Sequence, residues 1–112
     1  MNWIPLRDES QLRQICERSS GRPQVIFKHS TRCSTSALVK KRLERADQPE
    51  RIDFYYLDLL SNRPISNSIS QTFRVRHESP QVLLIVNGEC VYDESHLGIT
   101  MDEILERSDI RA

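Results

Sequence analysis

The sequence lacks several features that would place its 112 residues in a particular class of protein. Lysine plus arginine and aspartate plus glutamate each number 16, so there is no basic excess of the kind that nucleic-acid binding requires. No stretch approaches the roughly 20 apolar residues of a membrane span, and residues 1–8 lack the apolar core of a signal peptide. We therefore expect a single domain over residues 1–112, located in the cytoplasm, with neither nucleic acid nor membrane as partner.

Cysteines are also few, and no two of them form a C-x-x-C motif. The wide spacing of Cys16, Cys33 and Cys90 excludes a local dithiol redox motif and a zinc knuckle. Because the number is odd, at least one thiol is free. The histidines show no ligand spacing, so we expect no metal and no bound cofactor. Cys16 lies on the apolar face of a predicted helix and is expected to be a small buried hydrophobe. The face that Cys90 takes is open.

Cys33 stands where a predicted strand passes through a polar turn into a predicted helix. The unpaired N–H groups and the dipole at a helix start favour the thiolate, which is the nucleophilic form. We therefore predict that Cys33 is a redox nucleophile, with Arg32 adding positive charge. Ser36 stands where a C-x-x-C motif has its second cysteine, and its hydroxyl is a candidate donor to the thiolate. The alternatives are an inert core cysteine and a serine that is merely tolerated in the first helical turn.

Hydrophobic periodicity and turn signals predict an alternating series of helices and strands. Apolar and aromatic runs predict four strands, at residues 24–28, 52–60, 82–86 and 89–93. Capping and turn residues predict helix starts near Asp8, Cys33, Asn62 and Thr100. Two of these starts carry capping boxes, Asp8 with Gln11 and Thr100 with Glu103. Asn87 and Gly88 predict a tight hairpin between the last two strands.

The order α-β-α-β-α-β-β-α is that of a thioredoxin-like α/β fold. In this arrangement a small mixed sheet of four strands is sandwiched by helices, and the reactive thiol follows the first strand. The order supports the fold, whereas the function has to come from the site.

Four segments of the sequence point to one family. They are FKHSTRC at 27–33 with Ser36, RPISN at 63–67, HESPQ at 77–81 and SH at 95–96. On these segments the chain resembles the monothiol bacilliredoxins of the bacillithiol system over nearly its whole length. The resemblance implies that Cys33 is the nucleophile and that bacillithiol is a co-substrate. The sequence departs from many relatives at Ser34, where they have proline.

The resemblance also implies a set of substrate-binding residues. In thioredoxin-like proteins a cis proline faces the nucleophile and leaves the preceding backbone free to pair with substrate, a role that falls here on Ser79 and Pro80. Ser95 and His96 fall in the loop that recognises small thiols, and Thr31 belongs with them. The alternatives are a trans proline that starts a strand, and an ordinary turn before the last helix.

The stretch 21–43 contains six basic residues and no carboxylate. A solvated basic face is the usual explanation of such a run, and attraction of an anionic thiol substrate is the alternative. The basic residues are Arg22, Lys28, Arg32, Lys40, Lys41 and Arg42.

The sequence thus favours a thiol–disulfide oxidoreductase that removes bacillithiol from client proteins through Cys33. Its expected partners are a low-molecular-weight thiol and bacillithiolated proteins. One alternative is a thioredoxin-like adaptor module in which Cys33 is incidental. Another is a cluster-binding monothiol glutaredoxin, but such proteins carry C-G-F-S, and residues 33–36 lack that glycine and phenylalanine.

Overall fold

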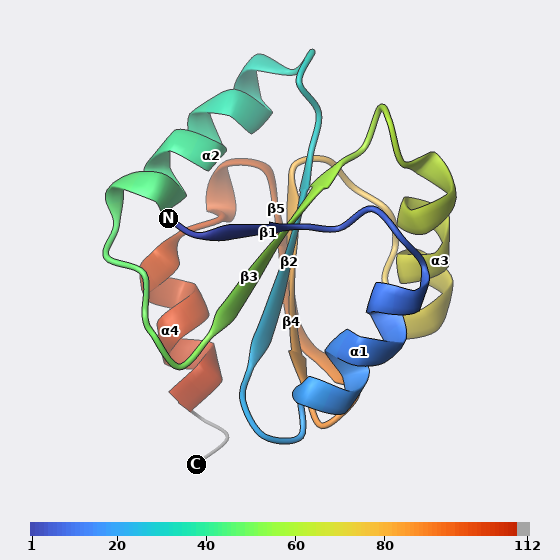
Figure 1. Cartoon of the computed structure of the whole chain (residues 1–112). Coiled ribbons are helices and arrows are strands. Elements are labelled where there is room, and N and C mark those ends of the chain that lie inside the picture. Colours follow the sequence, from blue (N-terminus) through green and yellow to red (C-terminus); the bar gives the residue numbers. More distant parts are fainter. Residues whose placement is uncertain (110–112) are drawn as a thin grey trace.

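The three most apolar runs of the chain form the middle of a mixed β-sheet, as the computed structural model of residues 1–109 shows (Figure 1). The strands are β1 (Trp3–Pro5), β2 (Gln24–His29), β3 (Asp53–Asp58), β4 (Gln81–Val86) and β5 (Glu89–Ser95). The helices are α1 (Ser10–Arg18), α2 (Ser34–Arg45), α3 (Arg63–Phe73), the 3₁₀ turn η1 (His96–Gly98) and α4 (Met101–Asp109). The expected alternation of helices and strands is therefore confirmed.

The sheet order is β1-β3-β2-β4-β5. β1, β3 and β2 run parallel, whereas β4 pairs antiparallel with both β2 and β5. The carboxyl end of β2 therefore lies beside the amino end of β4, because Lys28 is paired with Gln81. This pairing brings the segment that follows β2 and the segment that precedes β4 to the same edge of the sheet.

The prediction of four strands is wrong, because β1 makes a fifth. This strand has only three residues and ends in Pro5, so its sequence shows no alternation. Its tertiary contacts define it. Trp3 pairs with Phe54 of β3, stacks on the ring of Phe27 at 5.5 Å, and donates from Nε1 to Glu44 at 2.8 Å.

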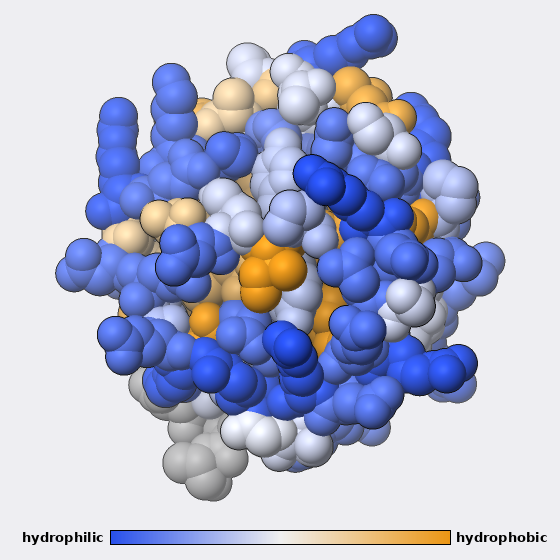
Figure 2. Space-filling model, viewed as in Figure 1, coloured by the Kyte–Doolittle hydropathy of each residue, from blue (hydrophilic) through white to orange (hydrophobic). Residues whose placement is uncertain are grey.

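Helices cover both faces of the sheet, with α2 and α4 on one side and α1 and α3 on the other (Figure 1). Alternate residues of the central strands supply the two cores, so Phe27 packs towards α2 and α4, and Ile26 towards α1 and α3. The face seen in Figure 2 is mostly hydrophilic, and its apolar areas are small and separate. None of the helices within residues 1–109 has the length and apolarity that crossing a membrane requires.

The predicted helix starts are found with one shift. α1 begins at Ser10 rather than at Asp8, because Asp8 forms a turn in which its Oδ1 accepts from the Ser10 N–H. Gln11 still reaches back, as a capping box requires, and accepts from the Asp8 N–H at 3.0 Å. At α4 the Thr100 hydroxyl accepts from the Glu103 N–H at 3.2 Å.

The predicted hairpin is also confirmed. Asn87 and Gly88 connect β4 to β5 with φ angles of 53° and 76°. Positive φ at both central residues is what a type I′ turn requires, and asparagine and glycine are the residues that adopt it at least cost.

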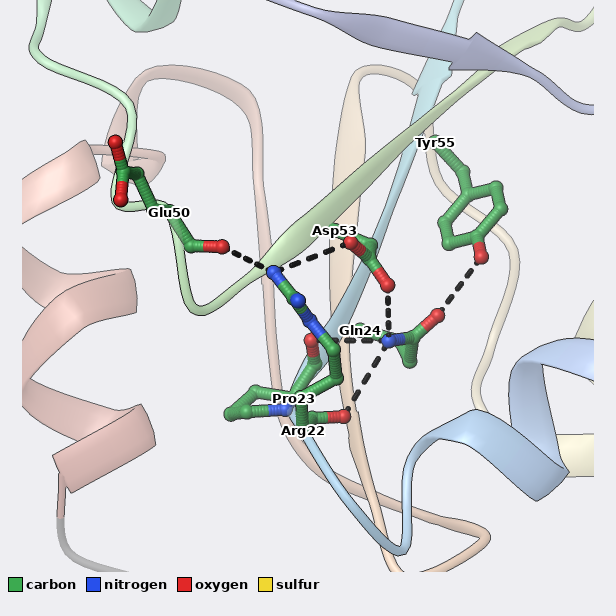
Figure 3. Close-up of polar contacts among 6 residues, drawn as sticks. All are labelled: Arg22, Pro23, Gln24, Glu50, Asp53 and Tyr55. Atoms are coloured by element: carbon green, nitrogen blue, oxygen red, sulfur yellow. Dashed lines mark hydrogen bonds and ion pairs between the residues drawn. The ribbon is translucent and has the colours of Figure 1, made fainter.

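A buried polar network closes the amino-terminal end of β2 and β3 (Figure 3). The Gln24 side chain is fully buried; its Nε2 donates to Asp53 at 2.8 Å, and its Oε1 accepts from the Tyr55 hydroxyl at 2.8 Å. Arg22 pairs with the same Asp53 at 3.3 Å and also bonds the carbonyl of Glu50. Every hydrogen-bonding group of the amide therefore has a partner, which makes its burial tolerable.

Replacement of Tyr55 by phenylalanine tests whether the buried Gln24 amide needs the tyrosine hydroxyl. The change leaves Gln24 Oε1 buried without a donor, so we expect a loss of about 1–3 kcal/mol in the free energy of unfolding. Tyr92→Phe is the matched control, because the Tyr92 hydroxyl is buried without a hydrogen-bond partner within the described residues. Tyr92→Phe should be neutral or stabilising. Urea denaturation measures the free energy of unfolding of both variants. Equal losses would show that the hydrogen bond from Tyr55 to Gln24 does not stabilise the fold.

Candidate active site at the start of α2

Cys33 is the N-cap residue of α2, as the sequence predicted. Its backbone is extended, with φ −105° and ψ 119°, and its N–H donates to the carbonyl of Ser30 at 3.1 Å. The thiol is half-buried, and the first turn of α2 contains no acidic residue. The helix N–H groups therefore present partial positive charge to the sulfur, and no carboxylate of this first turn offsets it.

Ser36 is fully buried under this turn and already has two partners. Its Oγ accepts from the Ser30 N–H at 3.1 Å and lies 2.6 Å from Nδ1 of His29. Burial, together with the charge of Lys40, lowers the pKa of His29, so the imidazole is neutral at pH 7. The neutral ring either accepts the hydroxyl hydrogen of Ser36 or donates to its oxygen. Only the second arrangement leaves that hydrogen available to Cys33, so the predicted role of Ser36 toward the thiolate stays a prediction.

The other predicted site segments meet at the same edge of the sheet. The Ser79–Pro80 peptide bond is cis, the isomer that the resemblance implied. His96 has a left-handed backbone, with φ 56°, and its N–H donates to the carbonyl of Pro80 at 3.0 Å. Its ring lies 3.2 Å from the Glu78 carboxylate, where it forms an ion pair when protonated. Ser95 is paired with Gln81 across β5 and β4. The structure thus joins Ser79, Pro80, Ser95 and His96 in one loop cluster.

The basic stretch surrounds Cys33 less completely than the sequence indicated. Arg22 lies at the opposite end of β2, paired with Asp53, and Lys28 is buried. Lys40 is paired with Glu44 at 2.7 Å.

Arg42 is also engaged, since it donates to the carbonyls of Leu97 and Ile99 and so ties α2 to η1. Among the six basic residues, Arg32 and Lys41 are exposed and have no ion pair within residues 1–109. Arg32 is therefore the unpaired basic residue of this stretch that is next to Cys33 in the sequence.

The family model of the monothiol bacilliredoxin BrxC matches residues 4–104. The chain belongs to the monothiol bacilliredoxin family. This match covers the Cys33 turn, the Ser79–Pro80 loop and the His96 segment together.

Solved structures agree with the fold of this family member. A protein described as a proposed oxidoreductase with a thioredoxin fold is 30% identical, with a TM-score of 0.82 over 93% of this chain and 91% of its own. Thioredoxin from Malassezia sympodialis is 16% identical, with a TM-score of 0.77 over 96% of this chain and 91% of its own. Thioredoxin from Fasciola hepatica is 17% identical, with a TM-score of 0.74 over 96% and 98%. The thioredoxin-like fold is therefore confirmed.

The two remaining cysteines of this bacilliredoxin family member lie away from the site, against the core on the α1 and α3 face. Burial raises the pKa of Cys90 to about 11, and its Sγ lies 3.3 Å from the carbonyl oxygen of Tyr92, to which it donates. Burial and the neighbouring Glu17 raise the pKa of Cys16. Both environments disfavour the thiolate, so they disfavour nucleophilic chemistry.

Two side chains near the site have contacts that the sequence did not indicate. Lys28 is a charged residue in a fully buried strand, and His77 contacts it from the loop before Pro80. Both belong to segments that carry the family resemblance, FKHSTRC and HESPQ, but no pattern in the sequence indicated that the two side chains meet. No group of three or more histidine, cysteine, aspartate or glutamate residues within 1–109 is arranged to hold a metal ion.

The three thiols should separate clearly in alkylation with iodoacetamide at pH 7. With a pKa of about 11, on the order of one Cys90 in 10,000 is ionised at this pH, so Cys90 should react slowest. Cys33 should react first. Peptide mass spectrometry after timed quenching gives the three rates. Faster modification of Cys16 or Cys90 than of Cys33 would contradict the assignment of the reactive thiol.

Proposed function

We propose that this chain is a monothiol oxidoreductase that removes bacillithiol from mixed disulfides on proteins in the cytoplasm. The observation that carries the proposal is the position of Cys33, a half-buried N-cap residue on a 12-residue helix whose first turn lacks acidic residues. Membership of the monothiol bacilliredoxin family supports the choice of substrate.

The reaction has two exchange steps. First, the Cys33 thiolate attacks the bacillithiol sulfur of the mixed disulfide. A new S–S bond joins Cys33 to bacillithiol, the S–S bond to the client breaks, and the client cysteine leaves as a thiolate that takes a proton from water. Second, a free bacillithiol thiolate attacks the bacillithiol sulfur attached to Cys33. This step forms oxidised bacillithiol and returns the Cys33 thiolate, so each step replaces one disulfide by another.

The neighbouring residues have distinct roles in this proposal. Arg32 and the start of α2 attract the carboxylates of bacillithiol and stabilise negative charge on sulfur. The backbone at Ser79 and Pro80 pairs with the substrate, and Thr31, Ser95 and His96 contact the small thiol. The Ser79 hydroxyl is buried without a hydrogen-bond partner within residues 1–109, so it offers an unused donor at this position.

Cysteine replacement tests the proposal. Cys33→Ser should abolish release of bacillithiol from a bacillithiolated protein, because serine is not a nucleophile for disulfides at neutral pH. Cys16→Ser and Cys90→Ser should retain most of the activity. Mass spectrometry follows both the client and the Cys33 adduct, with glutathionylated client as the comparison. Loss of turnover in Cys90→Ser would identify a resolving thiol, and an unreactive Cys33 in the wild type would favour the adaptor alternative.

Arg32→Ala should slow the reaction with bacillithiol disulfides more than with a neutral disulfide, by about threefold or more at low salt. The preference should shrink at high salt, because exposed charges are screened over about 10 Å at 0.1 M. Lys41→Ala is the matched control, since it removes an equal charge that lies two turns farther along α2. Equal losses for both substrates, or a Lys41→Ala effect as large as that of Arg32→Ala, would show that the charge beside Cys33 has no specific role.

A further inference from the structure

Lys28 is a fully buried cation in the strand that leads to Cys33. Its Nζ lies 3.2 Å from the Ser70 hydroxyl of α3 and 3.3 Å from Nδ1 of His77. No carboxylate forms an ion pair with it within residues 1–109. Burial lowers its pKa to about 8, so it is mostly protonated at pH 7 and carries a desolvation cost. Stability alone does not explain a lysine at this position.

The direction of the Lys28–His77 hydrogen bond follows from the chemistry of the ammonium group. An ammonium has only hydrogens to offer, so Nζ donates and Nδ1 of His77 accepts. The imidazole hydrogen of neutral His77 is therefore on Nε2. Burial and the charge of Lys28 lower the pKa of His77, which keeps the ring neutral and able to accept at pH 7.

This hydrogen bond ends on the loop that carries the cis proline. His77 is three residues before Pro80, in the connection between α3 and β4. The cross-strand partner of Lys28 is Gln81, also fully buried, whose Nε2 donates to the Arg76 carbonyl at 2.9 Å. Its Oε1 lies 3.4 Å from the Glu78 N–H. The buried side chains of Lys28 and Gln81, on adjacent strands, thus both bond to the connection between α3 and β4.

We propose that Lys28 and His77 are positioning residues, and that their hydrogen bond fixes the loop presenting Ser79 and Pro80 to the disulfide bound at Cys33. The inference rests on the proposed thiol–disulfide exchange. It gives a role to the contact between FKHSTRC and HESPQ, two segments far apart in the sequence. Attack on a disulfide requires an in-line arrangement of sulfurs, and small displacements of the supporting backbone slow such a step strongly.

The test separates substrate positioning from the reactivity of Cys33. Lys28→Met keeps an unbranched side chain one atom shorter and removes the ammonium donor, and His77→Leu removes the acceptor. Both should slow exchange with a bacillithiolated protein by about tenfold or more. Both should leave the rate of Cys33 alkylation by iodoacetamide within about twofold of the wild type, because that small reagent does not need the loop.

Two matched variants test whether the loss of exchange comes from the Lys28–His77 hydrogen bond. His77→Asn places an oxygen near the position of Nδ1, so it should restore exchange to within about threefold of the wild-type rate. Ser70→Ala removes the other partner of Lys28 but keeps the bond to the loop, so it should exchange at nearly the wild-type rate. The double variant Lys28→Met/His77→Leu should be no slower than the worse single variant, because each change removes the Lys28–His77 bond. His77→Leu alone also removes the 3.4 Å contact of Nδ1 with the Ser66 hydroxyl.

Three results would overturn the inference. They are exchange at the wild-type rate in folded Lys28→Met and His77→Leu, an equal loss of alkylation and exchange, or no recovery in His77→Asn. A thermal melt shows whether each variant is folded. If Lys28→Met does not fold, the His77 variants alone decide the test, because His77 is exposed.

Amide hydrogen exchange of residues 74–79 provides a readout that needs no turnover. It should be faster in Lys28→Met and His77→Leu than in the wild type and Ser70→Ala. Unchanged protection would overturn the inference. A wild-type protein that does not exchange disulfides at all would instead overturn the proposed function, while the amide measurement still decides whether the bond holds the loop.

Discussion

The antiparallel pairing of β2 with β4 is the constraint on which the rest of the site depends. Because Lys28 is paired with Gln81, the turn that carries Cys33 and the loop that carries Pro80 start from adjacent positions on one edge of the sheet. β5 pairs with β4 so that Ser95 lies opposite Gln81, and the His96 N–H then donates to the Pro80 carbonyl. A shift of the register by one residue would turn each strand over, because alternate side chains face opposite sides of a sheet. The cores and the site are thus specified by the same pairing.

The central strands β2 and β4 carry buried polar side chains, which are Gln24, Lys28, His29 and Gln81. Gln24 closes the amino-terminal end through Asp53 and Tyr55, far from Cys33. At the opposite end, Lys28 and Gln81 both hold backbone or side chains of the loop before β4. Burying such groups costs free energy unless they are hydrogen-bonded, so each of them restricts the chain to the conformation that satisfies it. Lys28 and Gln81 thus connect the buried part of the sheet to the loop before β4.

The electrostatics of the thiol come from a small number of groups. The start of α2 has no acidic residue in its first turn, and Arg32 precedes Cys33 in the chain, while other basic residues of the same stretch are buried, paired or at the far end of β2. By contrast, Cys16 and Cys90 lie where burial raises their pKa values. Of the three thiols, Cys33 is therefore the one to which the proposed function assigns nucleophilic attack. This selectivity fits a monothiol mechanism in which an external thiol, rather than a second cysteine, completes the cycle.

Local signals in the sequence determined the order of the elements, the position of Cys33 at a helix start and the Asn87–Gly88 hairpin, because capping, periodicity and turn residues act over a few positions. The sequence did not indicate β1, since three residues ending in Pro5 become a strand only when Trp3 packs on β3 and α2. The basic residues at 21–43 indicated a positive surface around Cys33. The fold instead buries Lys28 and places Arg22 at the opposite end of β2. The contacts of Ser36 with His29 and of Lys28 with His77 also belong to the tertiary structure. They join residues through sheet register and helix packing, which local sequence patterns do not encode.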